Sequence, residues 1–194
     1  MQKKAQKVKS GDEAALIRQV KRGNREAYQE IVKEYQKKLF SYVYRLTGSR
    51  EETEDIVQNV FVKAYRGIKS FDNKKRFSPW IYRIAHNEAV NYLKKRNKKK
   101  FVSWEDIVSS KDKLEMQSEE RSPLDDWLRK ESKRTVEQAL EQLPKKYQEV
   151  LTMRYFAEKS YEEIGEVIGK SVNTVGTLIS RAKKRLLDMV HSLE

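Results

Sequence analysis

The residues best suited to binding another molecule lie near the end of the chain. They are short polar side chains, which can form hydrogen bonds, followed by cations. Residues 160–187 are predicted to form two short helices joined by a tight turn. Ser160 and Glu163 fit a capping box that opens the first helix, Gly169 fits its end, and Ser171 is placed to cap the second. The inward positions of the second helix are apolar: Val172, Val175, Ile179, Ala182 and Leu186. Its outward positions carry hydrogen-bonding groups and cations: Asn173, Thr174, Thr177, Ser180, Arg181 and Lys184.

Such a surface can bind base edges and phosphates, so we predict a helix-turn-helix whose second helix lies in the DNA major groove. An ordinary helical hairpin is the alternative. The charge favours the DNA interpretation, because the chain carries +13 on 194 residues and residues 1–101 hold 26 Lys and Arg against 11 Asp and Glu. A basic half attracts polyanions, and phosphate contacts would make binding sensitive to salt.

The sequence also argues against a membrane protein and against disulfides or thiolate metal sites. A membrane surface is a competing partner, but no apolar run approaches the length of a membrane span, and the first residues lack the apolar core of a signal peptide. With no Cys the chain forms neither disulfides nor thiolate metal sites, and nothing argues against a reducing cytoplasm.

The first half of the chain is predicted to be helical throughout. Helices are expected over residues 12–22 and 25–47. Gly48 is expected to end the second of them, whose apolar residues recur at spacings of four and three: Ala27, Ile31, Tyr35, Leu39, Val43 and Leu46. A capping box of Ser49 and Glu52 is expected to open a third helix. Its buried face would consist of Ile56, Val57, Val60, Phe61, Ala64, Tyr65 and Ile68. Ser78 as cap, with Pro79 at the first helical position, is expected to start a fourth helix that runs to about residue 96.

A charged segment follows these helices. Lys94–Lys100 holds six cations in seven residues, for which we expect contact with a phosphate backbone; a solvated helix end is the alternative. Residues 102–131 hold 9 Asp and Glu against 5 Lys and Arg, so the linker 98–131 is predicted to be mostly flexible. Further helices are expected over residues 122–143 and 145–156, before the helix-turn-helix. The predicted fold is all-α, with two small helical domains, 1–97 and 132–194, joined by a flexible acidic linker.

Three stretches, which together cover nearly the whole chain, resemble one known family. TEDIVQNVF at residues 53–61 resembles the acidic-apolar-Gln-Phe helix of bacterial RNA polymerase sigma factors of the extracytoplasmic-function (ECF) group in the sigma-70 family. FSPWIYRIAHNEAVNYL at residues 77–93 resembles the promoter-melting helix of that family, and residues 143–185 resemble its final DNA-binding domain. Their order, with an acidic linker between, makes the resemblance specific.

The resemblance implies that the first of these helices docks on a coiled coil of the β′ subunit of the polymerase. The docking residues would be Glu54, Asp55, Gln58 and Asn59. They share one face of the predicted helix, opposite Ile56, Val60 and Phe61, as a polar docking face requires. Since the family usually has Glu where this chain has Asn59, the contact there is expected to be weaker.

The resemblance assigns the helix 80–91, and the loop before it, to opening the minus-ten promoter element and holding a flipped base. A flipped base needs an apolar or stacking wall and a donor and acceptor at its edge, which Tyr82, Ile84 and Asn87 could supply. The other residues expected to contact DNA here are Arg83, Asn91, Lys94, Lys95 and Arg96. Trp80 is expected to lie in the core, and His86 to be either a solvent-facing spectator or a DNA contact.

The resemblance assigns the second helix of the helix-turn-helix to the minus-thirty-five element, through the outward residues given above. Asn173 stands where Gly is common, Gly176 where Arg or Lys often contacts bases, and Leu178 replaces a frequent Arg. Gly inside a helix costs roughly 1 kcal/mol relative to Ala and brings no side chain to the groove. The contact is therefore expected to be weaker or altered in sequence preference.

We therefore expect a sigma factor with no catalytic residue, cofactor or metal. Its expected partners are the RNA polymerase core, through the β′ and β subunits, promoter DNA and an anti-sigma factor, and its expected location is the bacterial cytoplasm, at the nucleoid. One alternative is a stand-alone helix-turn-helix regulator, which would need only residues 132–194. The other is a nuclease or similar DNA enzyme, but the carboxylates at 51–55 lack a convergent second cluster and the chain has only His86 and His191.

Overall fold

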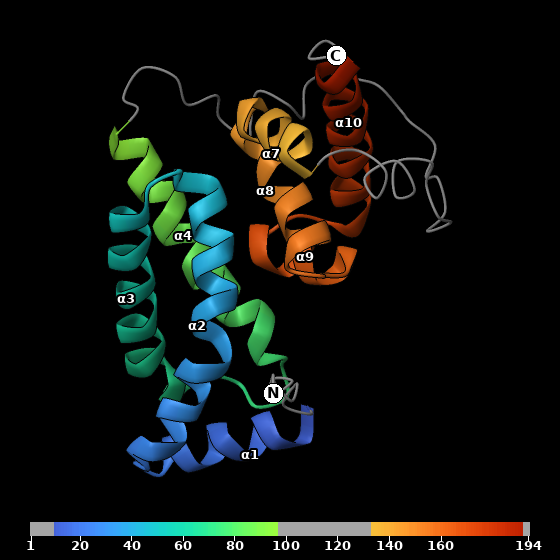
Figure 1. Cartoon of the computed structure of the whole chain (residues 1–194). Helices are drawn as coiled ribbons and strands as arrows, with labels where there is room; N and C mark the ends of the chain where they lie inside the picture. The colour runs from blue at the N-terminus through green and yellow to red at the C-terminus, as the bar shows by residue number, and fades with distance from the viewer. Residues whose placement is uncertain (1–9, 97–132, 192–194) are drawn as a thin grey trace, which may run out of the picture. The chain divides into compact units, whose positions relative to one another are not determined.

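The computed structural model describes residues 10–96 and 133–191, and every regular element in these ranges is helical (Figure 1). The chain divides into two compact units at Val90 and Asn91, and each unit is described by itself. The linker predicted over residues 98–131 lies outside the described residues, so its bounds stay a prediction.

The described part of the first unit contains three α-helices, one short 3-10 turn and most of a fourth helix, whose residues 91–96 lie beyond the boundary. The elements are α1 (Ser10–Lys21), α2 (Arg25–Thr47), α3 (Arg50–Gly67), η1 (Ile68–Ser70) and α4 (Phe77–Arg96). The bounds predicted for α2 are confirmed: the Asn24 side chain accepts a hydrogen bond from the Ala27 amide at 3.1 Å, and Gly48 ends the helix in the left-handed conformation. Both α1 and α3 pack against α2.

Aromatic and polar contacts between α2 and α4 form part of the buried core. The rings of Tyr42 and Tyr82 meet edge to face, with centroids 5.5 Å apart. The Tyr42 hydroxyl lies 3.2 Å from Nδ1 of His86, which is 6% exposed. His86 is therefore a satisfied core residue, and the expectation that it faces solvent or DNA is wrong.

Two details of α3 and one of α4 differ from expectation. Ser49 makes no side-chain cap; instead the Thr53 hydroxyl donates to the Ser49 carbonyl at 2.6 Å, so the predicted capping box is absent here. Tyr65, predicted to be buried, is 43% exposed and lies edge-on to Tyr28 at 4.9 Å between ring centroids. The helix α4 begins at Phe77, before the expected cap.

The second unit carries the helix-turn-helix. Its described elements are α7 (Lys133–Gln142), α8 (Lys145–Leu151), a π-helical turn η2 (Thr152–Phe156), α9 (Tyr161–Ile168) and α10 (Val172–His191). Helix α10 packs against α7, α8 and α9. Of the helix expected over 122–143, only the part from residue 133 is described.

Helix α9 has at both of its ends the caps that the sequence predicted. The Ser160 amide donates to the Glu163 carboxylate at 2.9 Å, and the Glu163 amide donates to the Ser160 hydroxyl oxygen at 3.2 Å. Gly169 has a φ of +69°. At Gly165 a Cβ would come 2.7 Å from the Lys170 carbonyl oxygen, so only glycine lets the backbone approach this closely.

The buried face of α10 differs from the predicted one at its edges. Val172 is 38% exposed, whereas Leu178 is 3% exposed and belongs to the core. Gly176, predicted to face outward, lies against α9, because a Cβ there would be 3.7 Å from the Tyr161 ring. Neither Leu178 nor Gly176 stands on the free surface of the helix.

A carboxyl group is buried in α8. Glu149 is 1% exposed, and its Oε2 atom has no hydrogen-bond partner among the described residues. Burial raises the pKa of Glu149 to about 8, and Lys145 opposes this shift. Glu149 is therefore mostly protonated in the folded protein at neutral pH.

The first prediction concerns this carboxyl. Between its ordinary pKa and about 8, the Glu149 carboxyl is ionised in the unfolded chain but protonated in the fold, so the free energy of unfolding falls as pH rises. Glu149→Gln removes this dependence. In thermal unfolding, the Glu149→Gln variant should melt at a higher temperature than the wild type. The difference in melting temperature should be larger at about pH 8 than at about pH 5. Glu141→Gln, at an exposed carboxylate, is the control, and an equal shift for both variants at both pH values would contradict the burial effect.

A second prediction compares two glycines. Gly176→Ala should stabilise the protein by up to roughly 1 kcal/mol, because Ala is the better helix former and its Cβ meets Tyr161 at ordinary contact distance. Gly165→Ala should destabilise it, because the new Cβ collides with a backbone carbonyl. Denaturant unfolding measures both, and selected DNA sites should be unchanged by Gly176→Ala. A new base preference would mean that residue 176 faces the groove after all.

Candidate nucleic-acid interface

The exposed face of α10 presents the polar residues that the sequence assigned to DNA. Asn173, Ser180 and Lys184 are exposed, and Thr174, Thr177 and Arg181 are half-buried. The Ser171 hydroxyl oxygen accepts the Thr174 amide at 3.2 Å and so caps the helix as predicted. The Thr177 hydroxyl donates to the Asn173 carbonyl at 3.0 Å, which leaves its oxygen lone pairs for donors outside the helix.

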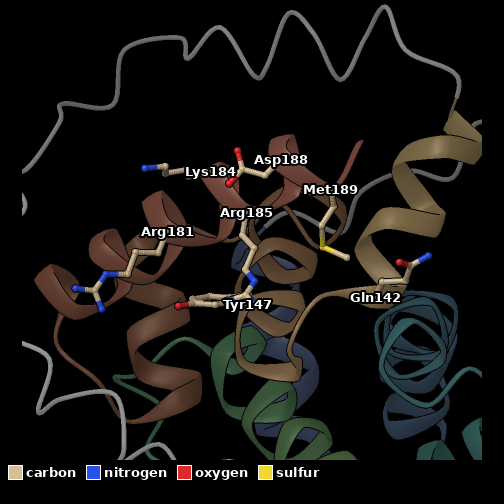
Figure 2. A pocket seen from close by; sticks show the side chains of 7 residues that line it. All are labelled: Gln142, Tyr147, Arg181, Lys184, Arg185, Asp188 and Met189. Carbon is tan, nitrogen blue, oxygen red and sulfur yellow. The ribbon is translucent and has the colours of Figure 1, made fainter. Parts of the chain in front are cut away.

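A groove of about 640 Å³ continues this face toward the end of α10. Its lining residues are Gln142, Tyr147, Arg181, Lys184, Arg185, Asp188 and Met189 (Figure 2). Arg185 extends toward Tyr147, so the floor is partly aromatic and the rim is cationic. Three cations and one carboxylate make the groove a basic extension of the α10 surface, and sequence reasoning assigned only Arg181 and Lys184 of this set.

Helix α4 presents a second polar face. Six residues assigned to minus-ten DNA are exposed: Arg83, Asn87, Asn91, Lys94, Lys95 and Arg96. Ile84 is half-buried. Spacings of three and four residues bring Trp80, Arg83 and Asn87 to one side of the helix. Residues 97–100 of the cationic run lie outside the described residues.

Tyr82 does not belong to this face. Its side chain is 2% exposed and packs on Tyr42, so the expectation that it forms the wall of a base pocket is wrong for this structure. Trp80, which we expected in the core, is half-buried and packs on Phe71 and Phe77, with ring centroids 5.0 and 5.2 Å away. The indole is thus the aromatic side chain on the polar side of α4.

One carboxylate lies beside this face, and a cation offsets it. Nζ of Lys63, on α3, is 2.5 Å from Oε1 of Glu88. The pair is only partly exposed on the Glu88 side, where screening by water is weaker than at the surface. Glu88 therefore repels an approaching phosphate less than a free carboxylate would.

The exposed face of α3 starts acidic and ends apolar. Glu54, Asp55, Gln58 and Asn59 are all exposed, as the sequence predicted. The same side continues into Val62, 48% exposed, and Tyr65, 43% exposed. Sequence reasoning missed both, although Val62 follows Gln58 and Asn59 at helical spacing and could have been found by extending that stripe.

A half-buried tyrosine on α2, Tyr28, supports the apolar end of this face. The Tyr28 hydroxyl donates to the Phe61 carbonyl at 2.5 Å. Burial raises the pKa of Tyr28 above its ordinary value, so the phenol stays protonated and remains a donor. Tyr65 rests edge-on against this ring and is therefore held outward.

Within residues 10–96 and 133–191, no group of three or more His, Cys, Asp or Glu side chains could hold a metal ion. Among the helices described there, none combines the length and apolar character of a membrane span.

Comparison with known proteins identifies related sequences over both units. The family model of sigma-70 region 2 matches residues 31–99, and that of sigma-70 region 4 matches residues 133–186. The ECF RNA polymerase sigma factor SigW of Bacillus subtilis is 35% identical over 181 residues, which cover 91% of this chain and 96% of that protein. The ECF RNA polymerase sigma-E factor of Escherichia coli is 32% identical over 180 residues, which cover 92% of this chain and 94% of that protein.

Solved structures with the same fold include two protein complexes, one of which contains a sigma factor. CnrH in complex with the cytosolic domain of CnrY matches with a TM-score of 0.68 at 22% identity, covering 93% of this chain and 97% of that chain. The sigma factor RpoE of Bartonella quintana, in complex with the anti-sigma factor NepR, matches with a TM-score of 0.61 at 19% identity, covering 84% of this chain and 96% of that chain.

The region 2 match covers most of the first unit and all of α4 with its polar face, and the region 4 match lies in the second unit. Because the region 2 match falls on the first unit, a stand-alone helix-turn-helix regulator is not favoured. The chain is a promoter-recognising, DNA-binding transcription initiation factor, and it belongs to the ECF group of RNA polymerase sigma factors in the sigma-70 family.

Proposed function

We propose that the two units divide the work of promoter recognition. The first unit binds the RNA polymerase core through α3 and opens the minus-ten element with α4 and the loop before it. The second unit reads the minus-thirty-five element with the exposed face of α10. Neither step requires a catalytic residue or a metal of this chain, because binding energy alone drives recruitment and melting.

The observation that carries this proposal is the mixed character of the exposed side of α4. Asn87 offers a donor and an acceptor for a base edge, and the half-buried Trp80 and Ile84 offer apolar surface beside it. Cations in the last turn of the same helix can hold the phosphate backbone of a single strand. An unpaired base needs all three kinds of contact within one surface.

The docking surface proposed on α3 consists of an acidic-polar part and an apolar end. Glu54, Asp55 and Gln58 would bind cations and amides of the β′ coiled coil. Val62 and Tyr65 would add apolar surface that is buried from water on binding, which a polar surface alone does not provide. The salt bridge of Arg50 with Glu54, at 2.9 Å, is largely exposed and would open at little cost.

Further partners follow from the family. Both similar solved structures are complexes, one of them with an anti-sigma factor, and we propose that an anti-sigma factor also controls this chain. Contacts of the second unit with the β subunit complete the holoenzyme. A factor with these partners works in the cytoplasm, at the nucleoid.

Replacement of Asn87 tests the minus-ten assignment. Asn87→Ala should lower open-complex formation and relax the preference at one minus-ten base, because a lost base-edge contact is worth roughly 1–3 kcal/mol. Permanganate probing of the melted strand on variant promoters measures this. Asn173→Ala is the control, since it should change the preference at minus thirty-five and leave the minus-ten preference as it was. If Asn87→Ala keeps the wild-type base preference, Asn87 does not read a base.

Replacement of polar residues on α3 tests the docking surface. The double variant Asp55→Ala with Gln58→Ala should weaken binding to core polymerase by roughly tenfold or more, in line with the loss of central interface residues. Fluorescence titration of labelled sigma factor with core polymerase gives the affinity. Glu26→Ala with Gln29→Ala removes the same kinds of side chain from exposed positions of α2 and should have little effect. Equal affinities for the two double variants would place the polymerase elsewhere.

A further inference from the structure

The loop between η1 and α4 is basic and ordered. Its middle residues, 72–76, are all exposed and include Lys74, Lys75 and Arg76. The Asp72 carboxylate accepts the Lys74 amide at 2.9 Å, and the Asp72 carbonyl accepts the Lys75 amide at 3.0 Å. These two bonds fold the loop into a tight turn that projects its cations into solvent.

Both ends of this loop are anchored in an aromatic cluster. Phe71, before the loop, is 5% exposed, and Phe77, after it, is 1% exposed. Their rings meet edge to face with centroids 5.5 Å apart. The ring centroid of Tyr35, on α2, lies 5.6 Å from that of Phe77. The Phe71 and Phe77 side chains therefore fix the two points at which the loop is attached to the core. Their rings alone do not fix the direction in which the backbone of the loop runs between these points.

A cation on α1 supplies that constraint. Nζ of Lys21 donates a hydrogen bond to the carbonyl oxygen of Phe71 and lies 5.9 Å from the centroid of the same ring. Lys21 is the last residue of α1, which packs on α2 and lies against η1, so the donor extends from a fixed base. A charged donor strengthens a hydrogen bond to a carbonyl, and the bond sets the orientation of the peptide at the first step of the loop.

We propose that Lys21 is a positioning residue for promoter opening: through the Phe71 carbonyl it holds the loop 72–76 in the orientation in which its cations meet the melted minus-ten strand. The proposal rests on the function proposed above for α4 and its preceding loop. Lys21 itself is half-buried beneath the loop and need not touch DNA. Its effect on melting passes through the loop.

Three substitutions on α1 test this role in the full-length protein with core polymerase. Lys21→Met keeps the aliphatic length but removes the donor and the charge, and Lys21→Arg restores both. Arg18→Met is the matched control, because it removes the same charge from an exposed position of α1. Open-complex formation should fall roughly threefold to tenfold in Lys21→Met, the loss expected for one hydrogen bond. It should be near wild type in Arg18→Met and largely restored in Lys21→Arg.

Two further readouts separate positioning from general stability. Hydrogen exchange at the amides of residues 72–76 should be faster in Lys21→Met than in Arg18→Met, while affinity for core polymerase stays the same in both. Equal promoter opening by Lys21→Met and Arg18→Met would overturn the proposal. Parallel losses of core binding and promoter opening in Lys21→Met would also overturn it, because Lys21 would then support the whole unit.

A loop variant distinguishes this inference from the function on which it rests. Lys74→Ala with Lys75→Ala should lower open-complex formation if the loop meets DNA. If that double variant melts promoters normally, the proposed role of the loop fails. If it is impaired while Lys21→Met is not, only the role of Lys21 fails.

Discussion

The packing of α4 against α2 is the constraint on which the first unit depends. Ala85 and Ala89 on α4 are fully buried, and the rings of Tyr35 and Phe77 also meet between the two helices, with centroids 5.6 Å apart. Tyr42 then fixes the rotation of α4 by contacting the Tyr82 ring and the His86 imidazole at once. Because these contacts hold one side of α4 in the core, the helix cannot rotate about its axis. The polar groups on its opposite side are therefore exposed in a single arrangement.

In the second unit, α10 likewise has one buried side and one exposed side. Val175, Ile179, Ala182 and Leu186 bury one side of α10, and Leu178 widens that side. Tyr161 lies beside Gly176 and also under the Arg154 guanidinium, 5.2 Å from its ring centroid. The other side of α10 stays exposed. Beyond Val172 the exposed residues there are polar or charged: Asn173, Ser180, Lys184, Arg185 and Asp188.

Local sequence signals predicted much of this architecture. The apolar spacing in α2, the Gly48 stop and the capping box at Ser160 each depend on residues within a few positions of one another, and the structure confirms all three. The side of α4 that faces the core was harder to predict, because the nine apolar or aromatic residues among residues 77–90 are spread around the helix and interleaved with five polar ones. Only distant partners, Tyr42 on α2 and Phe71 after η1, decide that Tyr82 is fully buried whereas Trp80 is half-buried. Tyr65 was misplaced because a tyrosine at the edge of an apolar stripe fits either side, and Tyr28 holds it outward.

The close approach at Gly165 limits how this helix-turn-helix can diversify. A single methyl group there would collide with the Lys170 carbonyl, so the angle between α9 and α10 is set by the backbone itself. If α10 reads DNA as proposed above, α9 and α10 approach it as one rigid body. A change of target sequence would then come from exchanges of side chains on the exposed face of α10 and not from a tilt of that helix.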